Sequence, residues 1–123
     1  MCHLGIGLPF AFASSLFYLI REFSDVTVVL AHCGTMDNEA ECILLEKEFP
    51  NVYLETSVRT PNQKNLKKFV KEVGSERVMY ASDSPDEMAH CVWEVRNCGF
   101  SEKQVEDILW KTAAKAFNIA DKI

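Results

Sequence analysis

Short apolar runs alternate along this chain with longer segments of helical spacing. Four runs are predicted to be strands: residues 1–4, 26–31, 51–56 and 77–81. The run at 26–31 is rich in β-branched residues, which is typical of a strand buried on both faces. Helices are predicted at residues 9–23, 37–49, 63–73, 86–98 and 101–118. This order predicts an α/β fold with parallel strands joined by helical crossovers.

Local signals mark several of the predicted helix ends. Pro9 suits the first turn of a helix, where its missing N–H costs little. Pro50 ends the helix predicted at residues 37–49. Gly74 and Gly99 suit the position just after a helix. Residues 101–104 resemble a capping box that opens the last helix.

The first twenty residues carry no Asp, Glu, Lys or Arg, so a signal peptide or a membrane span has to be considered. A signal peptide begins with positive charge, which this segment lacks. Gly5, Gly7 and Pro9 interrupt it, and the apolar run from Phe10 to Ile20 is shorter than the about 20 residues of a spanning helix. We therefore predict no membrane span, and a helix covered on most of its surface.

Composition narrows the class of protein. A length of 123 residues with 48% hydrophobic residues indicates a single domain, residues 1–123. The net charge of -5, without a basic patch, argues against nucleic acid. Five cysteines without a CxxC pair fit neither a disulfide framework nor a thiolate zinc site. Free thiols and a cytoplasmic location are expected.

Polar side chains follow three of the predicted strands. His3, His32 and Asp83 each lie at a strand's C-terminal end, where parallel α/β sheets place their chemistry. Imidazole binds zinc and similar ions and moves protons near neutral pH. His32 also suits a satisfied histidine at the sheet edge, and Asp83 suits a turn aspartate that bonds its own backbone before Pro85. The three residues form a candidate metal and acid–base set.

Other polar residues near the strand ends are weaker candidates. Ser57 and Arg59 follow the third strand and suit contact with a polar or anionic substrate group, or a plain surface loop. Cys33 lies beside His32, which leaves a thiol nucleophile open as an alternative.

Four segments carry a resemblance to a known family: His32-Cys33-Gly34, residues 51–57, residues 74–85 and residues 108–117. Their order and spacing resemble the amidohydrolase-related metal-dependent hydrolases. These are TIM-barrel enzymes that include amide and lactone hydrolases and decarboxylases of aromatic or muconate acids. The match spans nearly the whole chain but only the second half of the family's barrel.

The resemblance implies roles for three residues. His3 matches the metal ligand on the fifth strand, and His32 matches the sixth-strand histidine that assists proton transfer beside the metal. Asp83 matches the eighth-strand aspartate that binds the metal and takes the proton of the attacking water. The implied cofactor is one divalent ion, usually zinc, which lowers the pKa of a bound water toward about 7. The implied reaction on a small molecule is hydrolysis of a C–N or ester bond, with decarboxylation as the alternative.

The chain departs from the family pattern in three ways. It has no His-x-His pair like that of the family's first strand, Thr112 stands where the closing motif usually has asparagine, and a full barrel needs about 250 residues. Four parallel strands cannot close, so two edges and the inner face are expected to be exposed. Three outcomes stay open: a fragment that associates with a missing N-terminal half, a homo-oligomer that completes an eight-stranded barrel, or an open α/β sandwich. A non-catalytic half-barrel also stays open.

Overall fold

Parallel strands form the centre of the molecule. The computed structural model describes residues 1–5, 11–33, 38–57 and 63–122. Within them, one sheet holds four parallel strands in chain order: β1 (Cys2–His3), β2 (Val28–Ala31), β3 (Val52–Glu55) and β4 (Val78–Met79). Leu54 is the register partner of Leu30 on one side and of Val78 on the other. The predicted α/β fold with parallel strands is confirmed.

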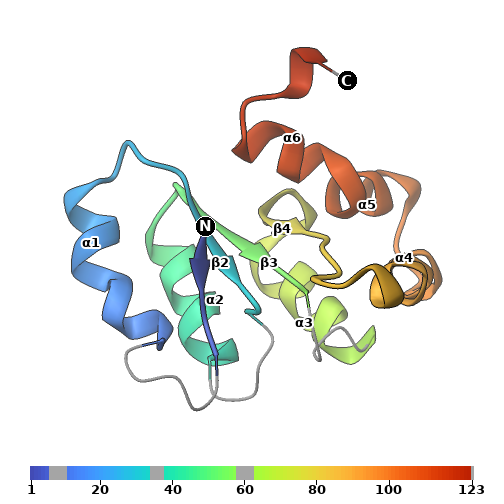
Figure 1. The fold of residues 1–123 in the computed structure, drawn as a ribbon, viewed down its shortest axis with the longest axis horizontal. Helices are drawn as coiled ribbons and strands as arrows, with labels where there is room; N and C mark the ends of the chain where they lie inside the picture. The colour runs from blue at the N-terminus through green and yellow to red at the C-terminus, as the bar shows by residue number, and fades with distance from the viewer. Residues whose placement is uncertain (6–10, 34–37, 58–62, 123) are drawn as a thin grey trace.

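Helices connect and cover the strands (Figure 1). They are α1 (Phe17–Glu22), α2 (Glu39–Glu48), α3 (Gln63–Val73), α4 (Met88–Asn97), α5 (Glu102–Glu106) and α6 (Thr112–Ala116). Helix α2 packs against α3, and α3 packs against α4. A π-helical turn, Asp107–Lys111, joins α5 to α6, so residues 102–116 form one continuous helical stretch. This stretch lies beside β4 (Figure 1).

Most predicted element ends lie within two residues of those in the structure, and the first helix differs most. A 3-10 turn at Ala13–Leu16 precedes α1, and residues 11 and 12 are not helical. Pro9 lies outside the described residues. The capping box is confirmed: the Gln104 N–H donates to Ser101 Oγ at 3.3 Å, and the Ser101 N–H donates to Gln104 Oε1 at 3.0 Å. Gly74 and Gly99 have φ of 87° and 77°, which suits glycine after a helix.

The two faces of the sheet have different cover, because successive side chains in a strand point to opposite faces. The face towards helices α1–α4 carries five residues of the main hydrophobic core: Val28, Leu30, Val52, Leu54 and Val78. The opposite face carries Val29, Tyr53 and Met79, on which two alanines of α6 pack. These three residues are 1%, 7% and 2% exposed. The prediction of an exposed inner face is therefore wrong at these three residues, which α6 covers.

The terminal helical stretch is fastened to the edge of β4. The Tyr80 N–H donates to the Ile108 carbonyl in the π turn at 2.7 Å. Thr112 Oγ1 donates to the Ser75 carbonyl at 3.2 Å, and Ser75 Oγ donates to the Asp107 carboxylate at 2.7 Å. The edge beside β4, which was expected to be open, is thus occupied at Tyr80. Thr112, where the resemblance implies asparagine, thus bonds to the backbone of Ser75.

The apolar segment that contains α1 is covered on one side only. Ala13 and Ile20 are buried in the core, and the Phe17 ring lies 5.3 Å from the Phe49 ring. Tyr18 is 79% exposed, and Leu19 is exposed as well. The prediction that most of this helix is covered is therefore wrong within this chain. Among the described residues, no helix has the length and apolar character needed to cross a membrane.

Candidate functional site

A pocket of about 260 Å³ lies at the C-terminal ends of the strands. Its lining comes from all four strand ends and consists of Met1, His3, Ala31, His32, Glu55, Ser57, Ala81 and Asp83. Parallel strands end at the same edge of a sheet, which brings these residues together. The structure therefore places His3, His32, Ser57 and Asp83 in one pocket. Arg59 lies outside the described residues.

The two histidines of the pocket are in direct contact. His3 Nδ1 lies 3.0 Å from His32 Nε2, and the rings meet edge to face with centroids 4.5 Å apart. His3 lies on the edge strand β1 and is exposed, whereas His32 follows β2 and is only 8% exposed. The pair presents ring nitrogens from two neighbouring strands to one point.

Two pocket residues have an unusual backbone conformation. His32 has a φ of 60° and Asp83 a φ of 59°, in the left-handed region that side chains other than glycine seldom adopt. This conformation costs roughly 1–2 kcal/mol per residue, less for aspartate than for most. Such strain clusters at functional sites, where the surrounding structure enforces it. The fold therefore holds two candidate residues in strained positions at the same pocket.

Glu55 is a pocket residue that the sequence reasoning did not single out. It ends β3, is 2% exposed, and accepts hydrogen bonds from the N–H of His32 at 3.2 Å and from Ser57. Along β3 it alternates with Leu54 and therefore shares the face of Tyr53 rather than that of the helices. A carboxylate as the last residue of a buried strand was the available signal.

Ser57 has its hydroxyl engaged inside the pocket. Its Oγ lies 2.8 Å from His32 Nδ1 and 2.8 Å from the Glu55 carboxylate. The side chain is buried with both partners. Its predicted contact with substrate stays a prediction.

Cys33 is unsuited to nucleophilic catalysis. It is completely buried, and burial raises the pKa of its thiol well above the usual value, with Cys42 and Glu55 adding to the rise. Since the thiolate is the nucleophile, a thiol in this setting is inert. Both observations argue against the alternative of a thiol enzyme that uses Cys33 with His32. All five cysteines are free, as predicted.

The sequence of most of the chain decides its family. Residues 14–119 match the profile of the family described as Amidohydrolase. The chain belongs to the amidohydrolase family. The predicted family resemblance is confirmed, whereas no curated protein matches the chain.

Solved structures share the fold of this amidohydrolase chain. Amidohydrolase 2 from Bifidobacterium longum subsp. infantis is 23% identical, with a TM-score of 0.68 over 87% of this chain and 46% of its own. A dihydroxybenzoic acid decarboxylase from Polaromonas sp. JS666, with bound manganese and the inhibitor 2-nitroresorcinol, is 21% identical, with a TM-score of 0.67 over 88% of this chain and 39% of its own. An amidohydrolase from Burkholderia multivorans with bound zinc is 18% identical, with a TM-score of 0.65 over 86% of this chain and 49% of its own. The chain thus spans less than half the length of these three proteins.

The donor atoms of the amidohydrolase pocket suit a divalent ion in kind but not in number. Imidazole nitrogens and a carboxylate are ligands of zinc and of similar metals. His3 and His32 bring two nitrogens within 3.0 Å of each other, and Asp83 lines the same pocket. Within the described ranges, no three His, Cys, Asp or Glu side chains lie close enough together to hold a metal. The described residues of the pocket therefore supply ligands of a suitable kind, but not the three close ligands that hold a metal.

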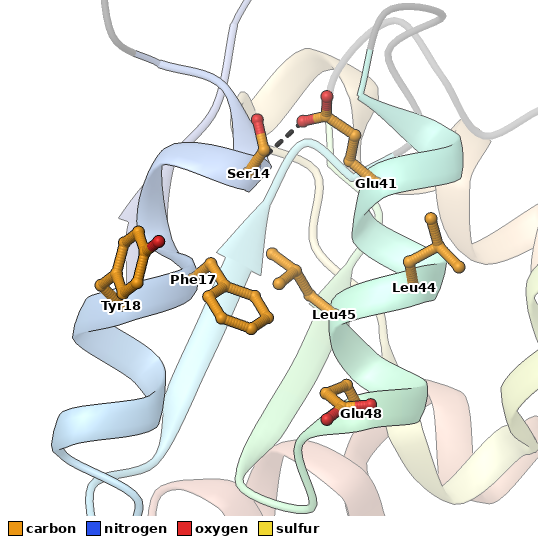
Figure 2. Close-up of a pocket in the computed structure, with 7 residues that line it drawn as sticks. All are labelled: Ser14, Phe17, Tyr18, Glu41, Leu44, Leu45 and Glu48. Atoms are coloured by element: carbon orange, nitrogen blue, oxygen red, sulfur yellow. Dashed lines mark hydrogen bonds between the residues drawn. The ribbon is translucent and has the colours of Figure 1, made fainter.

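A larger hollow of about 500 Å³ lies in the helical layer, away from the strand ends. Figure 2 shows Phe17 and Leu45 facing each other between α1 and α2, with the Ser14 N–H donating to the Glu41 carboxylate at 2.9 Å. Its lining is mainly apolar and holds no histidine or cysteine. We place the functional site at the smaller pocket because the chemically capable side chains converge there.

Proposed function

We propose that this chain supplies the C-terminal half of a metal-dependent amidohydrolase active site that acts on a small molecule. The contact between His3 and His32, with 3.0 Å between Nδ1 and Nε2, carries the proposal. The same pocket contains Asp83, and two of these three residues have a strained backbone. Such strain points to a function that the surrounding fold enforces.

His3 and Asp83 are the proposed metal ligands of this chain, with further ligands from outside its described residues. Zinc is the ion we favour, since histidine and carboxylate ligands suit it. The manganese and zinc in two similar structures support a divalent ion. When bound, such an ion lowers the pKa of a water to about 7 and makes hydroxide available at neutral pH.

The chain's own side chains then move protons and hold the substrate. Asp83 accepts a proton from the attacking water, and His32 holds or returns a proton through Nε2, which faces His3. Ser57 and Arg59 are the proposed contacts for polar or anionic substrate groups. We favour hydrolysis of a C–N or ester bond, because a carboxylate and two imidazoles that line one pocket suit attack by water.

Decarboxylation is the second candidate reaction. The fold shared with the Polaromonas protein supports it, because that protein is a dihydroxybenzoic acid decarboxylase. The substrate would then carry a carboxylate, which suits an arginine such as Arg59. A non-catalytic role is the remaining alternative, supported by the incomplete set of ligands within the described residues.

The rest of the barrel is proposed to come from an N-terminal half or from a second copy of this chain. The exposed side of α1, with Tyr18 and Leu19, supports an association of either kind. Sedimentation of the purified chain separates a homo-oligomer from a monomer that needs another partner. A cytoplasmic location completes the proposal and is supported by the five free cysteines.

Zinc binding by the purified chain tests the metal proposal. Titration calorimetry should detect one site per chain, and His3→Ala and Asp83→Ala should each abolish or strongly weaken it. His90→Ala is the matched control, because His90 lies exposed on α4, where it faces Glu94. Equal losses in all three variants, or no binding of zinc or manganese by the wild-type chain, would overturn the proposal for this chain.

The reaction class is tested separately with the metal-loaded chain. Release of an amine or alcohol from amide and ester substrates supports hydrolysis, whereas release of carbon dioxide from hydroxybenzoates supports decarboxylation. If the chain binds metal but converts neither hydrolase nor decarboxylase substrates, it supplies metal ligands to the site but does not catalyse the reaction by itself.

A further inference from the structure

Glu55 is a buried carboxylate that the proposed reaction does not use. Its Oε2 accepts from the His32 N–H at 3.2 Å and from Ser57 Oγ at 2.8 Å, while its Oε1 accepts from the Ser57 N–H. Both oxygens thus face backbone N–H groups, which can only donate. An ionised carboxylate can only accept, so the arrangement is complementary. Glu55 therefore holds Ser57 and the backbone of His32 together.

The bond to Glu55 decides what Ser57 does towards His32. A serine hydroxyl has one proton, and here that proton is directed to Glu55 Oε2. Ser57 Oγ must then act as an acceptor towards His32 Nδ1, which lies 2.8 Å away. The Ser57 carbonyl, which can only accept, lies 3.4 Å from the same Nδ1. Two acceptors thus face Nδ1, so this nitrogen carries the proton.

A proton on Nδ1 leaves the lone pair of the neutral imidazole on Nε2. Nε2 is the atom that lies 3.0 Å from His3 Nδ1 in the pocket. The hydrogen bond at one ring nitrogen sets which form of the other nitrogen is presented to a ligand. The two hydrogen bonds that run from Glu55 through Ser57 to His32 therefore select the form of His32 whose Nε2 can accept a proton or bind an electrophile in the pocket.

We propose that Glu55 and Ser57 are positioning residues that hold His32 as its Nδ1–H tautomer, with the Nε2 lone pair directed into the pocket. The use of that lone pair in catalysis rests on the proposed function. The tautomer itself does not, because it is a property of the chain without metal or substrate.

The tautomer can be measured directly by nuclear magnetic resonance. Long-range ¹H–¹⁵N correlation of the full chain, labelled at histidine and recorded without metal at a pH where ordinary imidazole is neutral, distinguishes protonated from unprotonated ring nitrogens. The chain has three histidines, so His32→Gln assigns the His32 signals. We expect a protonated Nδ1 and an unprotonated Nε2. A wild-type signal from the Nε2–H tautomer overturns the proposal.

Three variants test whether the two positioning residues cause this preference. Ser57→Ala should move His32 towards the Nε2–H tautomer that predominates in free histidine, whereas Ser57→Thr keeps a hydroxyl and should retain Nδ1–H. Glu55→Gln replaces an accepting oxygen with a donor and should shift the tautomer in the same direction as Ser57→Ala. The exposed His90 ring is the internal control and should not change. A full Nδ1–H signal in folded Ser57→Ala would remove Ser57 from this role.

A metal titration of the same variants keeps the two proposals distinguishable. If the wild-type chain binds zinc, Ser57→Ala should weaken binding far less than His3→Ala, because Ser57 bonds His32, which is not a proposed metal ligand. If the chain binds no metal but His32 shows the Nδ1–H tautomer, the proposed function fails and the positioning role stands. If Ser57→Ala unfolds, the wild-type tautomer and the Ser57→Thr variant still decide the inference.

Discussion

The anchor at Asp107 offers a quantitative test of how the terminal helical stretch is held. Asp107 is buried in the π turn and accepts from Ser75 Oγ at 2.7 Å and from Lys103 Nζ at 2.6 Å. Ser75 begins the 3-10 turn that leads into β4. Asp107→Ala removes both bonds and leaves the Ser75 hydroxyl without this acceptor. The stretch that covers the inner face of the sheet would lose its link to the start of β4.

The two bonds of Asp107 differ in their expected contributions. A buried hydrogen bond to a charged group contributes about 1.5–3 kcal/mol, which applies to Ser75. The Lys103 side chain is 72% exposed, so its ion pair adds little. Asp107→Ala should therefore lower the free energy of unfolding by about 1.5–3 kcal/mol. Glu106→Ala is the matched control, since the neighbouring Glu106 is exposed and pairs with Lys111; it should cost less than about 1 kcal/mol.

Urea unfolding at neutral and acidic pH checks both the size and the sign of the effect. Burial alone raises the pKa of Asp107, but hydrogen bonds from Lys103 and Ser75 outweigh it and hold the pKa below its usual value. A lowered pKa in the folded state gives stability that is complete above the unfolded pKa of about 3.9 and is lost as pH falls through the folded value. The gap between wild type and Asp107→Ala should therefore narrow below about pH 4. A loss no greater than that of Glu106→Ala, or a gap that widens in acid, would refute the reasoning.

Three further predictions concern the core and the pocket. Leu54→Ala should lower the free energy of unfolding, measured in urea, by about 2–5 kcal/mol, because Leu54 is fully buried. Leu44→Ala is the control, since Leu44 is exposed, and a similar loss in that variant would contradict this account. Asp83→Gly should leave the thermal midpoint unchanged or raise it, because glycine adopts a φ of 59° without strain; the gain in free energy of unfolding should be at most about 1 kcal/mol. The same variant should bind zinc more weakly. A drop in the midpoint would argue against strain at Asp83. Cys33 should react with iodoacetamide far more slowly than the partly exposed Cys2 in intact-mass analysis, and equal rates would disprove its burial.

Local periodicity and turn chemistry were enough to predict the order of strands and helices. The β-branched run at 26–31 predicted a buried strand, and Ser101 with Gln104 begins the last helix as predicted. The start of β2 was set two residues early, because Val26 is β-branched but lies exposed before the strand. Propensity alone does not separate a strand residue from an apolar residue in the loop before it.

Contacts between distant segments explain what the sequence reasoning missed. The cover over Tyr53 comes from Ala113 and Ala116, two small residues whose pairing with a sheet face depends on where α6 lies. His3, His32 and Asp83 were expected to lie together, and they line one pocket, because strand ends are readable from sequence. Glu55 was not, because its importance comes from bonds to residues 2 and 23 positions away, and a pattern of apolar residues does not encode those bonds.

The bond from the Tyr80 N–H to the Ile108 carbonyl has a consequence for how a barrel could be completed. An unpaired N–H at the edge of a sheet can bond to another strand, and unprotected edges lead to aggregation. Here a carbonyl of the chain's own π turn already occupies that position at 2.7 Å. A strand that joins beside β4 must first displace it, so docking on this side is an exchange rather than a simple addition. Its rate should then level off with rising partner concentration, limited by release of the chain's own helix.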